Sequence, residues 1–278
     1  MRSAGKLEKN MRKLGINFET VFFPGMTERD GLSLLRETGF DSFFTDYYYD
    51  ESILERYAQA AAEIGIGWES MHAPFEEPVN INAIWRQDET GDVMLDGLIR
   101  CVRACGRYGV PVAVIHLSSG VHAPGVCDAG CRRLDMLVEE AVKRNVVLGF
   151  ENLRKLSHLA FVFERYEEVP QVRFCWDTGH EACFTDGMQF MPLFGGRLAF
   201  THIHDNLCTC NGDLHLIPFE GRIDFERVAR QLRRSGYRGT LSLELLPYAS
   251  DRYAGISARD YYARAYAAAC RLRGMVDG

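Results

Sequence analysis

The sequence lacks long apolar runs. Even its richest stretch, Val110 to Leu117, has only the length of one buried strand, whereas a membrane-spanning helix needs about 20 apolar residues. No apolar segment follows the charged residues at the N-terminus, so we expect no secretory signal. Low-complexity segments, glycine-rich dinucleotide fingerprints and P-loops are also missing. These absences exclude a transmembrane chain and predict a cytoplasmic protein.

The chain also has no excess of basic charge. Its 32 lysines and arginines are outnumbered by 38 aspartates and glutamates, which gives a formal net charge of −6. Surfaces that bind nucleic acid are usually basic, so this balance argues against a nucleic-acid partner. Hydrophobic residues make up 47% of the chain and charged residues 25%, as expected for a globular protein with a sizeable core.

Cysteines are present but show no pairing pattern. Their number, nine, is odd, and most lie in apolar runs, where a reduced thiol packs as a small hydrophobic group. Cys127 and Cys131 are close in sequence, as are Cys208 and Cys210, but neither pair has the spacing of a strong zinc motif. We therefore expect free thiols in a reducing compartment.

Short β-branched or aromatic runs alternate with segments of helical period from residue 14 to the end. The strands are expected at 14–19, 42–46, 67–72, 112–117, 146–151, 173–177, 199–204 and 240–245. The helices are expected at 27–39, 51–65, 92–108, 130–145, 159–168, 188–194, 224–236 and 257–274. Candidate caps support several of these helices: N-caps at Thr27, Asp224 and Ser257, and closing glycines at Gly39, Gly65, Gly109 and Gly236.

This alternation, with no two strands in tandem, predicts an α/β protein with a parallel sheet. A length of 278 residues suits one closed barrel of about 250 residues. We therefore predict a single (β/α)8 TIM-barrel domain over residues 1–278, with 1–13 as an N-terminal extension. An open doubly wound sheet is the alternative.

Ionisable residues end most of the expected strands. In a TIM barrel the C-terminal ends of the strands carry the active site, so these side chains should converge on one pocket. Carboxylates buried together repel one another and are costly to desolvate unless a cation is present. Imidazole and carboxylate ligands together suit Zn²⁺, Mn²⁺, Co²⁺ or Fe²⁺. The residues at the strand ends are His72, His116, Glu151, Asp177, His180, His202, His204 and Glu244.

A further pair of candidate ligands follows the seventh strand. Asp213 and His215 are two residues apart, a spacing that places both side chains on one side of an extended loop. By itself this pattern is more typical of a surface turn. The ligands at the strand ends make a metal-binding role the better interpretation.

These motifs resemble the xylose isomerase-like barrel superfamily, which includes sugar phosphate isomerases and epimerases and the endonuclease IV class of AP endonucleases. The resemblance extends from about residue 14 to about residue 250. Its epimerase branch implies one divalent ion, held by the carboxylates and imidazole of Phe-Glu-Asn, Trp-Asp-Thr-Gly-His, Thr-His-Ile-His-Asp and Leu-Glu-Leu. The matching residues here are Glu151, Asp177, His202 and Glu244.

The endonuclease branch implies two further ions, and therefore a cofactor of one to three divalent metal ions. Two differences from the endonuclease sequences argue against a DNA-repair enzyme. Asn-Leu-Arg-Lys-Leu follows Glu151 where the endonucleases usually have Thr-Ala-Gly-Gln-Gly, and the stretch after His202 lacks their Leu-Asn-Asp motif. Phe219 also stands where many sugar isomerase-like sequences have glycine. The residues that match the ligands of the two further ions are His72, His116, His180, Asp213 and His215.

The resemblance implies an isomerase or epimerase acting on a small carbohydrate, a sugar or a sugar phosphate. Such an enzyme moves a proton next to a carbonyl through an enediolate, with Glu151 and Glu244 as the catalytic carboxylates. One alternative is an AP endonuclease, which is a phosphodiesterase. The other is a dehydratase or lyase that acts on a polyol or glycoside.

Two residues outside the ligand set are candidates for substrate binding. Arg222 either holds a substrate hydroxyl or phosphate or is an ordinary surface cation. Trp85, in the long loop after the third strand, either closes over a sugar ring or packs on an adjacent subunit in a homodimer.

Overall fold

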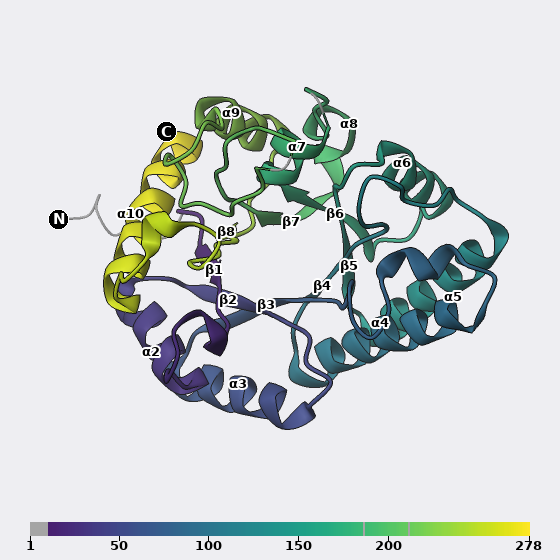
Figure 1. Cartoon of the computed structure of the whole chain (residues 1–278), viewed down its shortest axis with the longest axis horizontal. Coiled ribbons are helices and arrows are strands. Elements are labelled where there is room, and N and C mark those ends of the chain that lie inside the picture. Colours follow the sequence, from purple (N-terminus) through teal and green to yellow (C-terminus); the bar gives the residue numbers. More distant parts are fainter. Residues whose placement is uncertain (1–10, 186, 211) are drawn as a thin grey trace, which may run out of the picture.

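The computed structural model describes residues 11–185, 187–210 and 212–278. Its strands form one parallel sheet that curves into a barrel, with helices around the outside (Figure 1). The strands are β1 (Leu14–Asn17), β2 (Ser42–Asp46), β3 (Gly67–His72), β4 (Val112–Ile115), β5 (Val147–Glu151), β6 (Val172–Asp177), β7 (Leu198–His202) and β8 (Leu241–Leu243).

The outer layer consists of helices in the segments between the strands and after β8. The α-helices are α2 (Glu28–Thr38), α3 (Glu51–Ile64), α4 (Glu89–Tyr108), α5 (Asp128–Arg144), α6 (Leu156–Arg165), α7 (Thr178–Phe184), α8 (Met191–Phe194), α9 (Phe225–Ser235) and α10 (Ala258–Asp277). Short 3₁₀ helices are η2 (Thr20–Phe22), η3 (Ile81–Trp85), η4 (Gly195–Arg197) and η5 (Asp251–Tyr253).

The strand order is β7-β6-β5-β4-β3-β2-β1-β8, and every pairing is parallel. The barrel closes between β7 and β8 through a bridge at Ile203 and Leu243. Two backbone hydrogen bonds support this bridge: the N–H of Ile203 donates to Ser242 over 2.9 Å, and the N–H of Glu244 donates to Ile203 over 3.1 Å. The predicted (β/α)8 barrel is therefore confirmed, and the open sheet is excluded.

The apolar core has two parts. The larger part lies between the strands and the helices and includes the buried rings of Phe18, Tyr57 and Trp176. The smaller part consists of Phe44, Val112, Val114, Cys175 and Phe200. Phe44 and Phe200 of this smaller cluster contact the ring of His202, at centroid distances of 4.8 and 5.6 Å. Apolar packing thus lies directly beneath one of the predicted ligands.

The predicted helix caps are confirmed. The side chains of Thr27, Asp224 and Ser257 accept hydrogen bonds from backbone N–H groups in the first turns of α2, α9 and α10. The four closing glycines adopt left-handed conformations with φ between 71° and 118°, which only glycine adopts without strain. Short polar side chains and glycine therefore set these helix boundaries locally.

The sequence misplaced the helix that follows β6. A helix was expected near 188–194, but α7 begins immediately after β6, and only the short α8 lies near the expected range. The reason is that Asp177 ends the strand and also caps α7, because its side chain accepts the N–H of His180. Four expected strands also proved too long: residues 18–19, 116–117, 203–204 and 244–245 lie beyond strands that end at residues 17, 115, 202 and 243.

Two further expectations concern cysteines and membranes. All nine cysteines are free thiols, as predicted. None of the helices in the described ranges is long and apolar enough to cross a membrane.

Most of the expected N-terminal extension lies outside the described residues. Arg12 at its end is buried, pairs with Asp277 and donates to the backbone oxygen of Tyr237 over 2.8 Å, so this end of the chain packs against α10.

Candidate metal centre and active site

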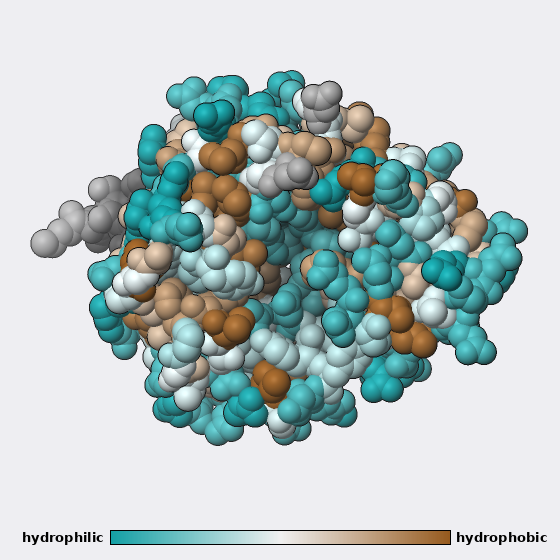
Figure 2. Space-filling model, in the orientation of Figure 1, coloured by the Kyte–Doolittle hydropathy of each residue, from teal (hydrophilic) through white to brown (hydrophobic). Residues whose placement is uncertain are grey.

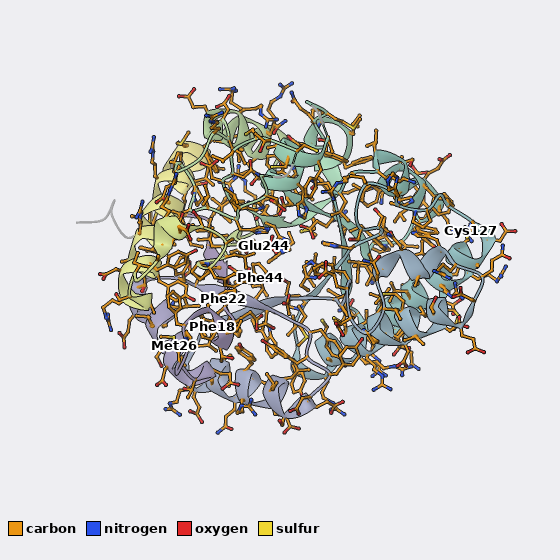
Figure 3. All side chains as sticks on the ribbon, in the orientation of Figure 1. Phe18, Phe22, Met26, Phe44, Cys127 and Glu244 are labelled. Atoms are coloured by element: carbon orange, nitrogen blue, oxygen red, sulfur yellow. The ribbon has the colours of Figure 1, made fainter. Side chains whose placement is uncertain are left out.

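A cavity of about 420 Å³ opens at the C-terminal ends of the strands. Figure 2 shows that the face viewed there is hollowed at its centre, with hydrophilic side chains around the hollow. In Figure 3, Glu244 and Phe44 lie near the centre of the ring of strands, whereas Cys127 lies at the periphery beside α5. Of the nine predicted metal ligands, the cavity is lined by His72, His116, Glu151, His180, Asp213, His215 and Glu244. Asp177 and His202 lie beneath it, with no exposed surface.

The four residues that the epimerase resemblance implies come together as a central group. Glu151, Asp177, His202 and Glu244 each offer one ligand atom, and these atoms lie within 4.8 Å of one another. The Nδ1 atom of His202 is 2.9 Å from Oε1 of Glu151 and 3.3 Å from Oε1 of Glu244. Parallel pairing helps to set this arrangement, because Asp177 of β6 lies in register with His202 of β7.

A second group shares Glu151 with the first. The Nε2 atom of His116 lies 2.8 Å from Oε2 of Glu151, and Nε2 of His72 lies 3.4 Å from the same oxygen. The two oxygens of Glu151 therefore face two different sets of imidazoles. This position would allow the one carboxylate of Glu151 to contribute to both groups of ligands.

A third group consists of His180, Asp213 and His215. Nε2 of His180 and Nε2 of His215 lie 3.4 and 3.5 Å from Oδ2 of Asp213. The loop reaches the cavity because Asp205 and Leu216 exchange two backbone hydrogen bonds of 2.8 Å. His215 has a φ of 46°, a left-handed conformation that costs a non-glycine residue about 1–2 kcal/mol. Surrounding contacts thus hold His215 beside Asp213 in a backbone conformation that is unfavourable in free energy.

The electrostatics of the central group fit a bound cation. Burial raises the pKa of Glu244 well above its usual value, and the charges of Glu151 and Asp177 raise it further. Burial also opposes ionisation of Glu151, but the nearby imidazoles of His202 and His116 outweigh it and hold the pKa of Glu151 well below its usual value. Without a cation, Glu244 therefore keeps a proton beside ionised neighbours. A divalent ion would replace that proton.

The donor atoms support the same conclusion. Oδ1 of Asp213 is buried and has no hydrogen-bond partner among the described residues. Burial lowers the pKa of His116 to about 4, so this imidazole is neutral near pH 7 and able to act as a ligand. Mixed nitrogen and carboxylate oxygen donors suit Zn²⁺, Mn²⁺, Co²⁺ or Fe²⁺. The residues of the cavity therefore fit the predicted metal chemistry.

Two residues that are not among the nine predicted metal ligands support those ligands from behind. Nε2 of His204 lies 3.1 and 3.2 Å from the two oxygens of Asp177, and its ring stacks on His215 at 3.9 Å. Asn152 holds the backbone of Asp177 with its side-chain amide. A Cβ atom at Gly179 would lie 1.8 Å from Cε1 of His204, so glycine is required for this close approach. The spacing of His202 and His204, two residues apart, was the sequence signal that could have indicated this supporting role.

A separate acidic group lies on the β1 and β2 side of the cavity. Glu19 is 6% exposed and accepts hydrogen bonds from the N–H of Asp46, over 2.6 Å, and from the hydroxyl of Tyr48. Burial raises the pKa of Glu19 well above its usual value, and the charge of Asp46 raises it further. Burial therefore favours the neutral form of this carboxyl group in the cavity wall. Its position just beyond a strand end was the missed sequence signal.

The two residues predicted to bind substrate lie elsewhere. Trp85 is 4% exposed, donates from Nε1 to the backbone oxygen of Leu117 over 2.7 Å and stacks on His158, so it is a packing residue. Arg222 is exposed and lines a separate groove with Glu181 and Arg227. Neither side chain lines the cavity, and we do not include them in the proposed site.

The fold and the ligand groups define a TIM barrel with a candidate metal centre at its strand ends. The family model for xylose isomerase-like TIM barrels matches residues 32–264, and the chain belongs to this family. A curated relative, an uncharacterized protein of Sinorhizobium fredii, is 28% identical over 284 aligned residues, which cover 89% of each chain.

Solved structures show the same fold at lower sequence identity. The 3-keto-D-glucoside 4-epimerase of E. coli is 18% identical, with a TM-score of 0.71 over 95% of this chain and 99% of that one. An L-ribulose 3-epimerase is also 18% identical, with a TM-score of 0.72 over 96% of each chain. The D-psicose 3-epimerase of Clostridium cellulolyticum is 14% identical, with a TM-score of 0.73 over 95% of this chain and 99% of that one.

Proposed function

We propose that the protein is a divalent-metal-dependent enzyme that isomerises or epimerises a sugar or a sugar phosphate. The observation that carries this proposal is the buried central group, in which Glu151, Asp177, His202 and Glu244 bring their ligand atoms within 4.8 Å of one another. The family and the epimerase names of the structural neighbours support a carbohydrate substrate. The free thiols support a cytoplasmic location.

The two catalytic carboxylates differ in their surroundings. Glu244 is 15% exposed and belongs to the wall of the cavity, whereas Glu151 is 1% exposed and lies between His116 and His202. An ion held by the central group would stabilise negative charge on the carbonyl oxygen of the substrate. We propose that one of these carboxylates, Glu151 or Glu244, removes the proton from the neighbouring carbon, and that the other, which has taken up a proton from solvent, donates it to the substrate. The first carboxylate then releases its proton to solvent. Return on the opposite face gives an epimer, and return to the adjacent carbon gives an isomer.

We also propose that the cavity holds more than one ion. The second group, with His72 and His116, and the third group, with His180, Asp213 and His215, have their own ligand atoms within 4.8 Å of one another. A three-ligand site leaves a coordination position open for water or substrate, as in catalytic metal sites. The third group would therefore bind an ion that takes part in substrate binding.

Proton exchange with solvent tests the proposed reaction directly. The metal-loaded protein is incubated in D₂O with a panel of ketoses and ketose phosphates, and deuterium at the carbon next to the carbonyl is measured by NMR. We expect incorporation with at least one substrate, and its loss on removal of the metal with a chelator. Absence of exchange with every substrate tested would falsify the proposal.

The second candidate is a phosphodiesterase of the AP endonuclease type. It is favoured by one observation, the presence of all three ligand groups around one cavity, because several ions together can activate water and stabilise a leaving phosphate oxygen. Incubation of the metal-loaded protein with an abasic DNA duplex separates the two functions. Cleavage without proton exchange would favour the phosphodiesterase.

A further inference from the structure

Arg154 lines the cavity three positions after Glu151, in the segment between β5 and α6. It is the only arginine or lysine among the described residues that line the cavity. Six carboxylates line the same space, namely Glu19, Asp46, Glu76, Glu151, Asp213 and Glu244. Among the described residues, Arg154 nevertheless forms no ion pair with any of them and no side-chain hydrogen bond.

Stacking explains why Arg154 remains apart from these carboxylates. Its guanidinium carbon lies 3.5 Å from the centre of the Phe184 ring. A guanidinium over an aromatic face is held by cation–π attraction, yet its N–H donors point outward along the edge of its plane. The stack therefore fixes the orientation of the group and leaves its hydrogen-bonding edge available.

The backbone on either side of Arg154 is also held. Asn152 is tied to the backbone of Asp177, as described above. Lys155 donates from Nζ to the backbone oxygens of Ala123 and Pro124, the latter over 2.9 Å. Arg154 thus projects from an anchored segment, which reduces the entropy lost when it binds a ligand.

The platform beneath Arg154 is connected to the third ligand group. Phe184 follows His180 by four residues on α7, and the two rings stack at a centroid distance of 4.9 Å with an interplanar angle of 22°. Arg154 is therefore placed close to the side of the cavity where His180, Asp213 and His215 meet.

We propose that Arg154, stacked on Phe184, binds an anionic group of the substrate, either a phosphate or a carboxylate. This inference rests on the proposed function and narrows its substrate class to charged sugars. Two oxygens of a carboxylate or of a phosphate match the fork of a guanidinium and bind it with paired hydrogen bonds. A neutral sugar would offer the arginine only uncharged hydroxyl acceptors, which bind a guanidinium more weakly.

The test uses polyol ligands without an aldehyde or ketone group, so that binding is measured without turnover. D-glucitol, D-glucitol 6-phosphate and D-gluconate are titrated into the metal-loaded protein by calorimetry; the last two distinguish phosphate from carboxylate. Hydrogen bonds between charged partners are stronger than those between neutral groups. We therefore expect one of the two anionic ligands to bind about 10–100 times more tightly than D-glucitol.

Three variants establish the role of Arg154. Arg154→Met should lose most of this preference, and Arg154→Lys should keep part of it because the charge remains. Phe184→Leu retains the arginine but removes its platform, and should also weaken the preference. The matched control is Arg132→Met, which removes an exposed arginine on the outer helix α5 and should bind like the wild type. Circular dichroism and metal content verify that each variant is folded and loaded.

Equal binding of the neutral and anionic ligands by the wild type would overturn the inference, as would no binding of any of them. An unchanged preference in Arg154→Met would do the same. These outcomes are separate from failure of the proposed function. Arg154-dependent anion binding without deuterium exchange would remove the isomerase proposal alone, whereas exchange with neutral and charged sugars at equal KM would remove only the anion site.

Discussion

Asn152 and Asp177 are joined by two hydrogen bonds of 2.8 Å each. The side-chain oxygen of Asn152 accepts the N–H of Asp177, and its side-chain nitrogen donates to the carbonyl oxygen of Asp177. Both residues are buried, so water does not replace these bonds. The pair connects the ends of β5 and β6. Because Glu151 directly precedes Asn152, these hydrogen bonds also fix the position of the Glu151 carboxylate relative to that of Asp177.

Asn152→Ala should therefore reduce both stability and metal affinity. Each buried backbone group left unpaired costs about 1–3 kcal/mol, which urea denaturation of the metal-free protein would measure. Metal affinity should fall about 10–100-fold, as is typical when an outer partner of a ligand is removed, and chelator competition would measure it. Asn82→Ala is a matched control, because the side chain of Asn82 forms the same pair of hydrogen bonds with the backbone of Ser119. These bonds are 2.8 and 2.9 Å long and lie away from the central group. An equal loss of metal affinity in both variants would contradict this role for Asn152.

Glu244→Gln should abolish turnover and leave the fold intact. The amide cannot remove a proton, and loss of a general base costs about 10²–10⁴-fold in rate. The main apolar packing of the barrel lies away from this side chain, so the circular dichroism spectrum and melting temperature should change little. Glu139→Gln, on the exposed surface of α5, provides the control for a loss of charge. If Glu244→Gln unfolds the protein, Glu244 has a structural role instead.

Asp213→Asn should remove one metal ion and leave the central group occupied. Asp213 faces both His180 and His215, so its carboxylate is the charged member of the third group. Elemental analysis should find at least two equivalents of Zn, Mn, Co or Fe in the wild type purified without chelator, and one equivalent fewer in this variant. Anomalous scattering at the metal edge locates the ions. A single peak beside Glu151, Asp177, His202 and Glu244, even in excess metal, would refute the multinuclear site.

Glu19→Gln should stabilise the protein increasingly as the pH rises. In the unfolded chain the carboxyl group ionises near its reference pKa of about 4.3, whereas in the folded protein burial and Asp46 raise the pKa and keep the proton bound. Between these two pKa values, ionisation of Glu19 favours the unfolded state more strongly at higher pH. Glutamine resembles the protonated form and removes this effect. The difference in free energy of unfolding between variant and wild type, measured with urea between about pH 5 and 8, should increase with pH. A constant difference would show that Glu19 is ionised in the folded protein.

The fold was predictable because its signals are local. Alternating apolar runs gave the strands, and residues such as Thr27 and Gly39 marked helix ends through contacts within a few residues. The strand ends were less predictable. Glu19 lies beyond the end of β1, and α7 begins at Asp177 without the loop that usually separates strand from helix. A residue that ends a strand and caps a helix at once has no distinct signal in a single sequence.

The sequence by itself determined the barrel and the types of side chain at its mouth, because strand alternation and ionisable residues are properties of short segments. Only the tertiary structure decided which of these side chains meet. Closure of the barrel brings Glu244, which directly follows the last strand, to within 3.3 Å of His202, and the pairing of Asp205 with Leu216 carries Asp213 to His180. The same folding buried Trp85 and left Arg222 outside the cavity. Such distances depend on contacts between residues far apart in the chain, which local patterns do not specify.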